Sequence, residues 1–317
     1  MAIEILPLED GLTFGSRVRG VTHQALGDEA IRECINAAFE DRGVLVFEDV
    51  EPSGAMHVAL SNVFGPLKEH PVPIIARVDE ETMPGVIDMF HKPETGKIVE
   101  INGERLMSWS PWHFDHCYNN ELNRAGVLRA LIIPPEGGLT CFADGIELYE
   151  AISSDLREEI EDKNIIYTLN TLFDDMRHGK PKGFRNVHTP QSQYDLLAYS
   201  KKLPRAVHPA VWTRADGRKV LHVSPWMAVA IEGMENEAGD ALLTAICEEI
   251  LAKVQLYGHA WKTTDMLIWD NWRVLHAVTG NDPQYLRRMQ RTTILGDYGL
   301  GYFEHNGVGD KLLEMTV

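Results

Sequence analysis

The chain has 317 residues, of which 44% are hydrophobic and 24% charged, and its formal net charge is −17. This balance is typical of a globular protein and excludes fibrous repeats and long disordered tracts. A charge this negative repels phosphate backbones, so we expect no nucleic-acid partner. The sequence has no run of about 18 apolar residues, so we expect no membrane span. The acidic first ten residues do not resemble a secretory signal, and we therefore expect a cytoplasmic protein.

The four cysteines, Cys34, Cys117, Cys141 and Cys247, are far apart and include no C-x-x-C pair. This spacing argues against a disulfide framework and against a zinc knuckle. We expect reduced, buried thiols, as is usual in the cytoplasm.

The N-terminal part of the chain predicts a helix, a strand and a second helix. Asp28 can cap a helix to about Asp41, and Val44–Phe47 is a short apolar run typical of a buried strand. Ser53 can cap the second helix, which we expect to end near Phe64.

Residues 70–112 are expected to be irregular, because they contain five prolines and three glycines. A loop of this length in a compact domain is usually functional, so we expect it to cover a substrate site. A second irregular region, residues 170–205, is rich in Lys, Arg, Pro and Gln and is expected to be a surface insertion.

Short strand-like runs dominate the rest of the chain. They comprise residues 127–133, 139–142, 207–212, 220–223, 266–269, 274–278 and 287–295. Helical segments interrupt them, one capped by Asp144 and running to about Ile160, the other over residues 237–254. The pattern predicts a single domain over residues 1–317, mainly β with flanking helices, whose core is a closed barrel or two packed sheets.

One candidate metal site stands out in the sequence. His113 and Asp115 are two residues apart, and on a strand such residues point to the same face. The pair alone is weak, because histidine–carboxylate pairs are also common in ordinary folds. With His276 it would form the two-histidine, one-carboxylate set of non-haem Fe(II) oxygenases. The same alternation turns His116 to the other face, so we expect it outside the metal site.

Two arginines near the C-terminal end are candidates for an anion site. Arg287 and Arg291 share one face of a predicted strand, while Arg288 takes the other. In a protein this acidic, two neighbouring cations favour binding of an anion. The alternative is that both are solvated charges on an edge strand.

These residues belong to a longer series of motifs in residues 42–47, 64–67, 70–71, 112–115, 137–140, 269–271, 287–291 and 293–297. In this order and spacing, nearly the whole chain resembles the TauD/TfdA family of Fe(II)/2-oxoglutarate dioxygenases. The resemblance implies a double-stranded β-helix (a cupin-like jelly roll) as the fold. It also implies Fe(II) as cofactor, with 2-oxoglutarate and O2 as cosubstrates.

The resemblance assigns roles to individual residues. His113, Asp115 and His276 match the family's iron ligands, which are also its catalytic centre. Thr140 and Arg287 match the pair that binds the distal carboxylate of 2-oxoglutarate.

Substrate contacts follow from the same comparison. Arg291 matches an arginine near the proximal carboxylate and the substrate's anionic group, and His70 matches a substrate-contacting histidine. Pro73 and Trp109 replace a tyrosine and an asparagine that contact taurine in the taurine enzymes. We therefore expect Trp109 at the substrate and, in place of taurine, a small organic anion with an apolar body. The alternatives are that His70 is an ordinary loop histidine and that Trp109 only packs.

The implied reaction is hydroxylation of this anion, with release of succinate and CO2. Hydroxylation at a carbon that bears oxygen or sulfonate would also cleave the molecule. By resemblance we expect a homo-oligomer, a dimer or a tetramer. Two other classes stay open: a zinc-dependent hydrolase using the same three ligands, and a non-catalytic jelly-roll binding protein.

Overall fold

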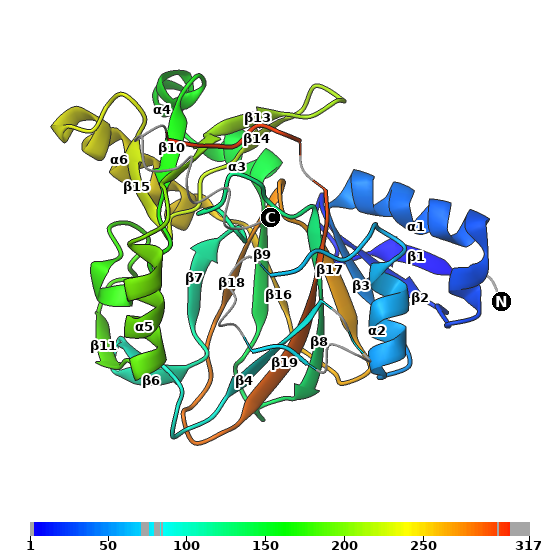
Figure 1. Cartoon of the computed structure of the whole chain (residues 1–317). Coiled ribbons are helices and arrows are strands. Elements are labelled where there is room, and N and C mark those ends of the chain that lie inside the picture. The colour runs from blue at the N-terminus through cyan, green and yellow to red at the C-terminus, as the bar shows by residue number, and fades with distance from the viewer. Residues whose placement is uncertain (1–2, 71–75, 79–82, 84, 297, 305–317) are drawn as a thin grey trace.

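Two β-sheets form the centre of the molecule (Figure 1). The computed structural model describes residues 3–70, 76–78, 83, 85–296 and 298–304. The larger sheet has the order β1 (Glu4–Pro7), β2 (Ser16–Arg19), β3 (Val44–Phe47), β17 (Met266–Asp270), β8 (Ala125–Ile132), β19 (Arg287–Ile294) and β4 (Val86–His91). The smaller sheet has the order β16 (Leu256–His259), β9 (Thr140–Asp144), β18 (Val274–Val278) and β7 (Ser110–His113). All pairings in both sheets are antiparallel except that of β2 with β3.

The two sheets face each other across a common core. Leu128, Trp269 and Met289 of the larger sheet pack in one cluster with Phe142 and Val274 of the smaller sheet. Alternating strand residues supply such a core, because every second side chain points to the same face. The predicted double-stranded β-helix is thus confirmed, in its two-sheet form.

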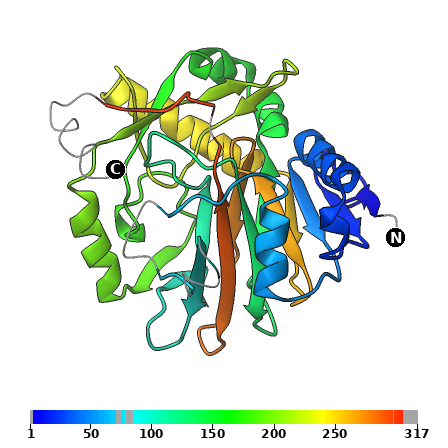
Figure 2. The same ribbon diagram turned by 45° about the vertical axis from the view of Figure 1, so that its right-hand side comes forward.

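The first two helices cover the outer face of the larger sheet (Figures 1 and 2). Helix α1 (Glu29–Arg42) begins after Asp28, whose side chain accepts from the backbone N–H of Ala30. Gly43 ends it in a left-handed conformation (φ 73°), where glycine is favoured. Helix α2 (Gly54–Ser61) is capped by Ser53 as predicted, but it ends three residues before Phe64.

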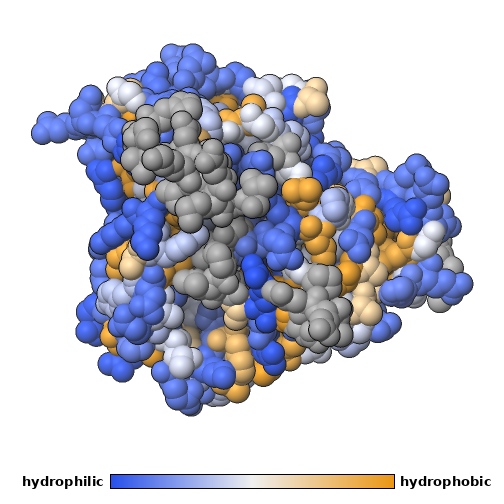
Figure 3. All heavy atoms as spheres, in the orientation of Figure 1, coloured by the Kyte–Doolittle hydropathy of each residue, from blue (hydrophilic) through white to orange (hydrophobic). Residues whose placement is uncertain are grey.

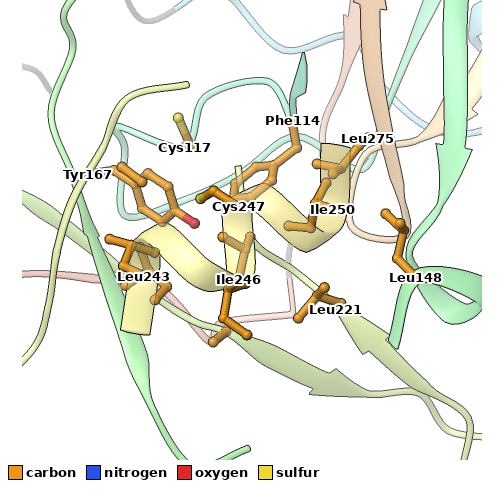
Figure 4. Close-up of a cluster of buried hydrophobic side chains, with 14 of the residues drawn as sticks. Phe114, Cys117, Leu148, Tyr167, Leu221, Leu243, Ile246, Cys247, Ile250 and Leu275 are labelled. Atoms are coloured by element: carbon orange, nitrogen blue, oxygen red, sulfur yellow. The ribbon is translucent and has the colours of Figure 1, made fainter. Parts of the chain in front are cut away.

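A second layer of structure lies against the other side of the smaller sheet. Its main helix is α6 (Glu237–Lys253), which presents Leu243, Ile246 and Ile250 to a buried cluster (Figure 4). Phe114 and Leu275 enter the same cluster from the smaller sheet's side. The cluster therefore anchors the chain at Phe114, the residue between His113 and Asp115.

Further elements complete this layer: α3 (Gly145–Ala151), α4 (Ser154–Ile160), β10 (Asn164–Tyr167), β12 (Ala206–Pro209), β13 (Val211–Thr213), β14 (Lys219–Leu221), β15 (Ala228–Ile231) and β20 (Tyr302–Phe303). The helix predicted from Asp144 to Ile160 is thus two helices, which break at Ile152 and Ser153. The strand predicted over residues 207–212 is likewise divided between β12 and β13.

The prediction of an irregular segment over residues 70–112 is wrong for its second half. Besides β4 and most of β7, it contains β5 (Ile98–Ile101) and β6 (Glu104–Met107). Strand β5 pairs with β11 (Phe184–His188), which lies in the expected insertion and precedes α5 (Gln191–Ser200). Pro111 does not interrupt β7, because this strand lies at the edge of its sheet, where a missing backbone N–H is tolerated.

The visible surface is mainly hydrophilic (Figure 3). On the face shown in Figure 3, hydrophilic side chains dominate the periphery and hydrophobic ones are scattered between them. No helix in the described part of the chain is both long enough and apolar enough to cross a bilayer. Cys117, Cys141 and Cys247 are buried free thiols as expected, whereas Cys34 is exposed.

Candidate metal and cosubstrate site

Three side chains converge where β7 and β18 lie side by side. His113 is the last residue of β7 and lies in register with His276 of β18, with ring centroids 4.1 Å apart. Oδ1 of Asp115 is 3.9 Å from Nε2 of His113 and 3.8 Å from Nε2 of His276. One ligand atom from each of the three lies within 4.8 Å of the others. This spacing suits one metal ion, and the ligand set is that of non-haem Fe(II) sites.

The imidazoles of His113 and His276 favour the neutral form, which can donate a lone pair to a metal ion. Nδ1 of His113 is 2.7 Å from the carbonyl oxygen of Pro111. A carbonyl only accepts, so Nδ1 carries the proton and Nε2 keeps its lone pair. Burial lowers the pKa values of His113 and His276, which favours the neutral, metal-binding form.

The orientation of Asp115 has a different cause from the predicted strand alternation. Strand β7 ends at His113, so strand alternation does not orient the carboxylate. Instead, the Asp115 N–H donates to Oδ1 of Asn271 (2.7 Å), and Nδ2 of Asn271 donates to the Asp115 carbonyl (3.0 Å). Asn271 also donates to the side chain of Asn123 (3.1 Å). Asn271 therefore fixes the backbone of Asp115, a role that its place in a motif did not reveal.

The charge of Asp115 is balanced by Arg291. Nη1 of Arg291 donates to Oδ2 of Asp115 at 2.5 Å, and both side chains are buried. Burial alone would raise the pKa of Asp115, but the charge of Arg291 beside it holds that pKa below its usual range. The predicted anion-site arginine thus lies directly at the metal-binding carboxylate.

Among the residues that the structure describes, none forms an ion pair with the buried cation Arg287. It lies on β19 between β8 and β4, only 3% of its surface is exposed, and burial lowers its pKa to about 10. Within the described residues, its Nη2 is buried and has no hydrogen-bond partner. The edge-strand alternative therefore does not apply to Arg287. An uncompensated buried guanidinium is costly, which indicates that an anion binds here.

Thr140 lies two residues beyond a glycine that approaches Arg287. A Cβ atom on Gly138, two residues before Thr140, would lie 3.3 Å from Nε of Arg287. Thr140 is itself buried, and its Oγ1 accepts a 3.0 Å hydrogen bond from Nε1 of Trp261. The segment that leads into Thr140 thus lies against Arg287.

A cavity of about 150 Å³ is lined by two of the three metal-site residues, His113 and Asp115. Its apolar wall consists of Phe114, Leu169, Leu196, Trp226 and Met227. His70, His116 and Arg291 supply polar groups to the same cavity. Such a combination, an apolar wall with a few polar groups, is typical of a small-molecule site.

His116 is outside the group of three ligands, as expected, but it is not turned away from the site, because it lines the cavity. It is buried, its backbone has a positive φ of 60°, and its ring meets that of His70 edge-on at 5.1 Å. Neither of its ring nitrogens has a hydrogen-bond partner in the described part of the protein. The alternation argument fails because the strand has already ended at His113.

Trp109 lies apart from this cavity. Its ring packs against Phe173 (centroids 5.0 Å apart) and Phe184 (5.6 Å). It lines a separate cavity of about 560 Å³, together with Lys180 and Leu256. This placement favours the packing alternative for Trp109. Pro73, the other departure from the taurine pattern, lies outside the described residues.

Comparisons with known proteins agree with this geometry. The sequence model of one protein family, described as "Taurine catabolism dioxygenase TauD, TfdA family", matches residues 4–293 of this chain. An alpha-ketoglutarate-dependent 2,4-dichlorophenoxyacetate dioxygenase of Cupriavidus pinatubonensis is 27% identical over 285 residues, which are 86% of this chain and 91% of that protein. An (S)-phenoxypropionate/alpha-ketoglutarate-dioxygenase of Sphingobium herbicidovorans is 27% identical over 300 residues, 93% of this chain and 96% of that protein.

Solved structures show the same fold. A taurine dioxygenase from Burkholderia xenovorans superposes with a TM-score of 0.67 at 24% identity, over 93% of this chain and 90% of that one. AAD-2, solved in complex with Mn(II) and N-oxalylglycine, superposes with a TM-score of 0.69 at 23% identity, over 95% of this chain and 100% of that one.

Proposed function

We propose a substrate class and a set of residue roles for this protein on the premise that it belongs to the taurine catabolism dioxygenase TauD, TfdA family. It is an oxidoreductase, a 2-oxoglutarate-dependent dioxygenase that uses Fe(II), 2-oxoglutarate and O2. We propose that its substrate is a small organic anion with an apolar body. The expected products are the hydroxylated anion, or its cleavage products, together with succinate and CO2.

The residues present fit the iron that this class requires. His113, Asp115 and His276 would hold Fe(II), since their ligand atoms lie together and both imidazoles favour the neutral form. When bound, Fe(II) with 2-oxoglutarate and O2 supplies the oxidising power that breaks a substrate C–H bond. Asn271 keeps Asp115 in place, and the cavity's apolar wall excludes water from the reacting groups.

The anchor for 2-oxoglutarate is assigned to Arg287 and Thr140. A carboxylate placed between them would receive a charge-assisted hydrogen bond from the guanidinium and a second hydrogen bond from the hydroxyl. Such a ligand would also supply the negative charge that Arg287 lacks. A zinc hydrolase has no need for this second, buried anion site, so the dioxygenase accounts for more of the observed residues.

The observation that carries the substrate proposal is the composition of the cavity at the metal site. An apolar wall favours an apolar or aromatic body, and Arg291, His70 and His116 favour an anionic or hydrogen-bonding head group. The activities for which two relatives are named also point to such molecules, since dichlorophenoxyacetate and phenoxypropionate are aromatic carboxylates. Trp109 does not support the proposal, because it lines the other, separate cavity.

A substrate panel tests this proposal. Purified protein with Fe(II), 2-oxoglutarate and O2 is given taurine, alkylsulfonates, aryloxyalkanoates and terpenoid carboxylates, and substrate-dependent succinate release is measured. We expect the larger apolar acids to stimulate succinate release and taurine to do so weakly. Strong coupling with taurine alone, or with a neutral or cationic compound, would contradict the proposal. The expected dimer or tetramer and the cytoplasmic location stay predictions, of which light scattering tests the first.

A further inference from the structure

The hydroxyl of Thr140 is constrained on one side by a tryptophan. Nε1 of Trp261 donates to Thr140 Oγ1 at 3.0 Å. An indole N–H can only donate, so the threonine oxygen is the acceptor in this contact. Its own proton remains available, and no protein group accepts it within the described ranges of the chain.

Trp261 is itself held by its neighbours. The ring of His259 meets the indole edge-on, with centroids 4.6 Å apart. His259 is buried, its Nδ1 lies 2.9 Å from the hydroxyl of Tyr257, and its Nε2 lies 3.2 Å from Oδ2 of Asp265. Strand β16 also places His259 in register with Thr140 on β9. The indole therefore approaches Thr140 from a fixed direction.

A carboxylate has only acceptor atoms, so it needs the proton of the threonine hydroxyl and is repelled by its lone pairs. A freely rotating hydroxyl presents either side, and ordering it on binding costs affinity. The Trp261 N–H occupies one acceptor position of Thr140 Oγ1 before any ligand binds. The hydroxyl proton is thereby left for a ligand.

We propose that Trp261 is a positioning residue for 2-oxoglutarate, which orients the Thr140 hydroxyl as a donor to the distal carboxylate. This inference rests on the proposed roles of Thr140 and Arg287 in binding the cosubstrate. Trp261 itself need not touch 2-oxoglutarate. Its contribution should depend on the Thr140 hydroxyl and on the ligand's distal carboxylate.

The test measures cosubstrate affinity and not turnover. Fe(II)-loaded protein is titrated without oxygen, and the visible metal-to-ligand charge-transfer band reports binding of 2-oxoglutarate or of 2-oxobutanoate, which lacks the distal carboxylate. The variants are Trp261→Phe, Thr140→Val, Thr140→Ser and the combinations of Trp261→Phe with each threonine variant. Trp212→Phe serves as a matched control, because Trp212 is a buried tryptophan in the cluster around α6. Thermal melting of each variant reports whether it is folded.

We expect Trp261→Phe to raise the Kd for 2-oxoglutarate about 3- to 10-fold, the usual range for one hydrogen bond. The Kd for 2-oxobutanoate should stay within about 2-fold, and Trp212→Phe should change neither. Adding Trp261→Phe to Thr140→Val should cause no further loss, whereas adding it to Thr140→Ser should again weaken 2-oxoglutarate.

Two results would overturn the inference in distinguishable ways. If Trp261→Phe weakens both ligands, or weakens binding equally with and without the Thr140 hydroxyl, Trp261 acts only through packing. If Thr140→Val leaves 2-oxoglutarate affinity unchanged, the proposed cosubstrate role of Thr140 fails, and this inference fails with it.

Discussion

Arg291 donates from Nη1 to Oδ2 of Asp115 at 2.5 Å, so the metal-binding carboxylate is paired with a guanidinium inside the protein. Arg291 and Asp115 are both buried, and separating such a pair leaves an uncompensated charge. The ion pair therefore keeps Asp115 ionised in the metal-free protein, and the acid behaviour of the site depends on it.

Replacing Arg291 should destabilise the metal-free protein and change its response to acid. For Arg291→Gln we expect a loss of about 3 kcal/mol at neutral pH, because Asp115 stays buried without its partner. In the wild type the pKa of Asp115 is lowered, so its stabilising effect is full above its unfolded pKa near 3.8 and is lost as pH falls below that value. In the variant the effect of burial on the Asp115 pKa is less opposed, so this acid-dependent loss should be smaller, and the difference in stability between the two proteins should shrink as the pH falls.

Urea denaturation at a series of pH values measures this difference. Arg288→Gln is the matched control, because Arg288 pairs with Asp88 from the other face of the same strand and is partly exposed. An exposed pair of this kind should contribute about 1 kcal/mol or less. If both variants lose the same free energy of unfolding, the buried pair contributes no more to stability than the exposed one.

The metal ligands can be tested by removal. His113→Ala or Asp115→Ala should abolish Fe(II) binding and succinate formation, because the site has three protein ligands and none to spare. Metal content after gel filtration and a thermal melt separate loss of metal from loss of fold. Near-normal succinate production by either variant would refute the ligand assignment.

Arg287 should control both cosubstrate affinity and stability. Arg287→Met removes the charge-assisted hydrogen bond to the distal carboxylate, a change that typically costs about 2–5 kcal/mol, or roughly 30-fold and more in apparent KM. A 2-oxo acid without that carboxylate should be affected far less. The variant should also melt at a higher temperature without cosubstrate, since it no longer buries an uncompensated charge. Equal weakening of both acids would assign the arginine another role.

Sequence patterns predicted the elements whose signals are local. The cap at Asp28, the apolar run at Val44–Phe47 and the long strand that begins at Arg287 each correspond to a structural element. Strand β5 was missed although it forms a hairpin with β6 across Asn102 and Gly103, because the surrounding prolines and glycines suggested a loop. Its other partner, β11, lies more than 80 residues away. Non-local pairing leaves little trace in a short window of sequence.

The same limit applies to the site. His113, Asp115 and His276 could be named from motif spacing, but the means by which Asp115 is held could not. Asn271 and Trp261 act through hydrogen bonds to residues more than 100 positions away. His116 is outside the group of three ligands, as predicted, but its place in the cavity wall was missed because the alternation rule was applied beyond the end of β7.

His116 should contribute to substrate recognition. Its ring lines the cavity at the metal site, and both of its nitrogens are buried without a partner among the described residues. A buried polar group that lacks a partner is costly, and a substrate head group that hydrogen-bonds to it would remove this cost. We therefore expect His116→Leu to raise the KM for the best substrate of the panel about 10-fold. Binding of 2-oxoglutarate, followed by its charge-transfer band, should change little.

The control for this prediction is His222→Leu. His222 is also buried and also lacks a partner for either nitrogen within the described residues, but it stacks between Phe114 and Trp272 and does not line the cavity. If both histidines matter only for packing, both variants should change the melting temperature and leave the KM for substrate unchanged. If His116→Leu lowers stability and leaves the KM for substrate unchanged, His116 is a structural residue. A selective rise in KM at His116, with full succinate formation at saturating substrate, would place its imidazole against the head group of the substrate.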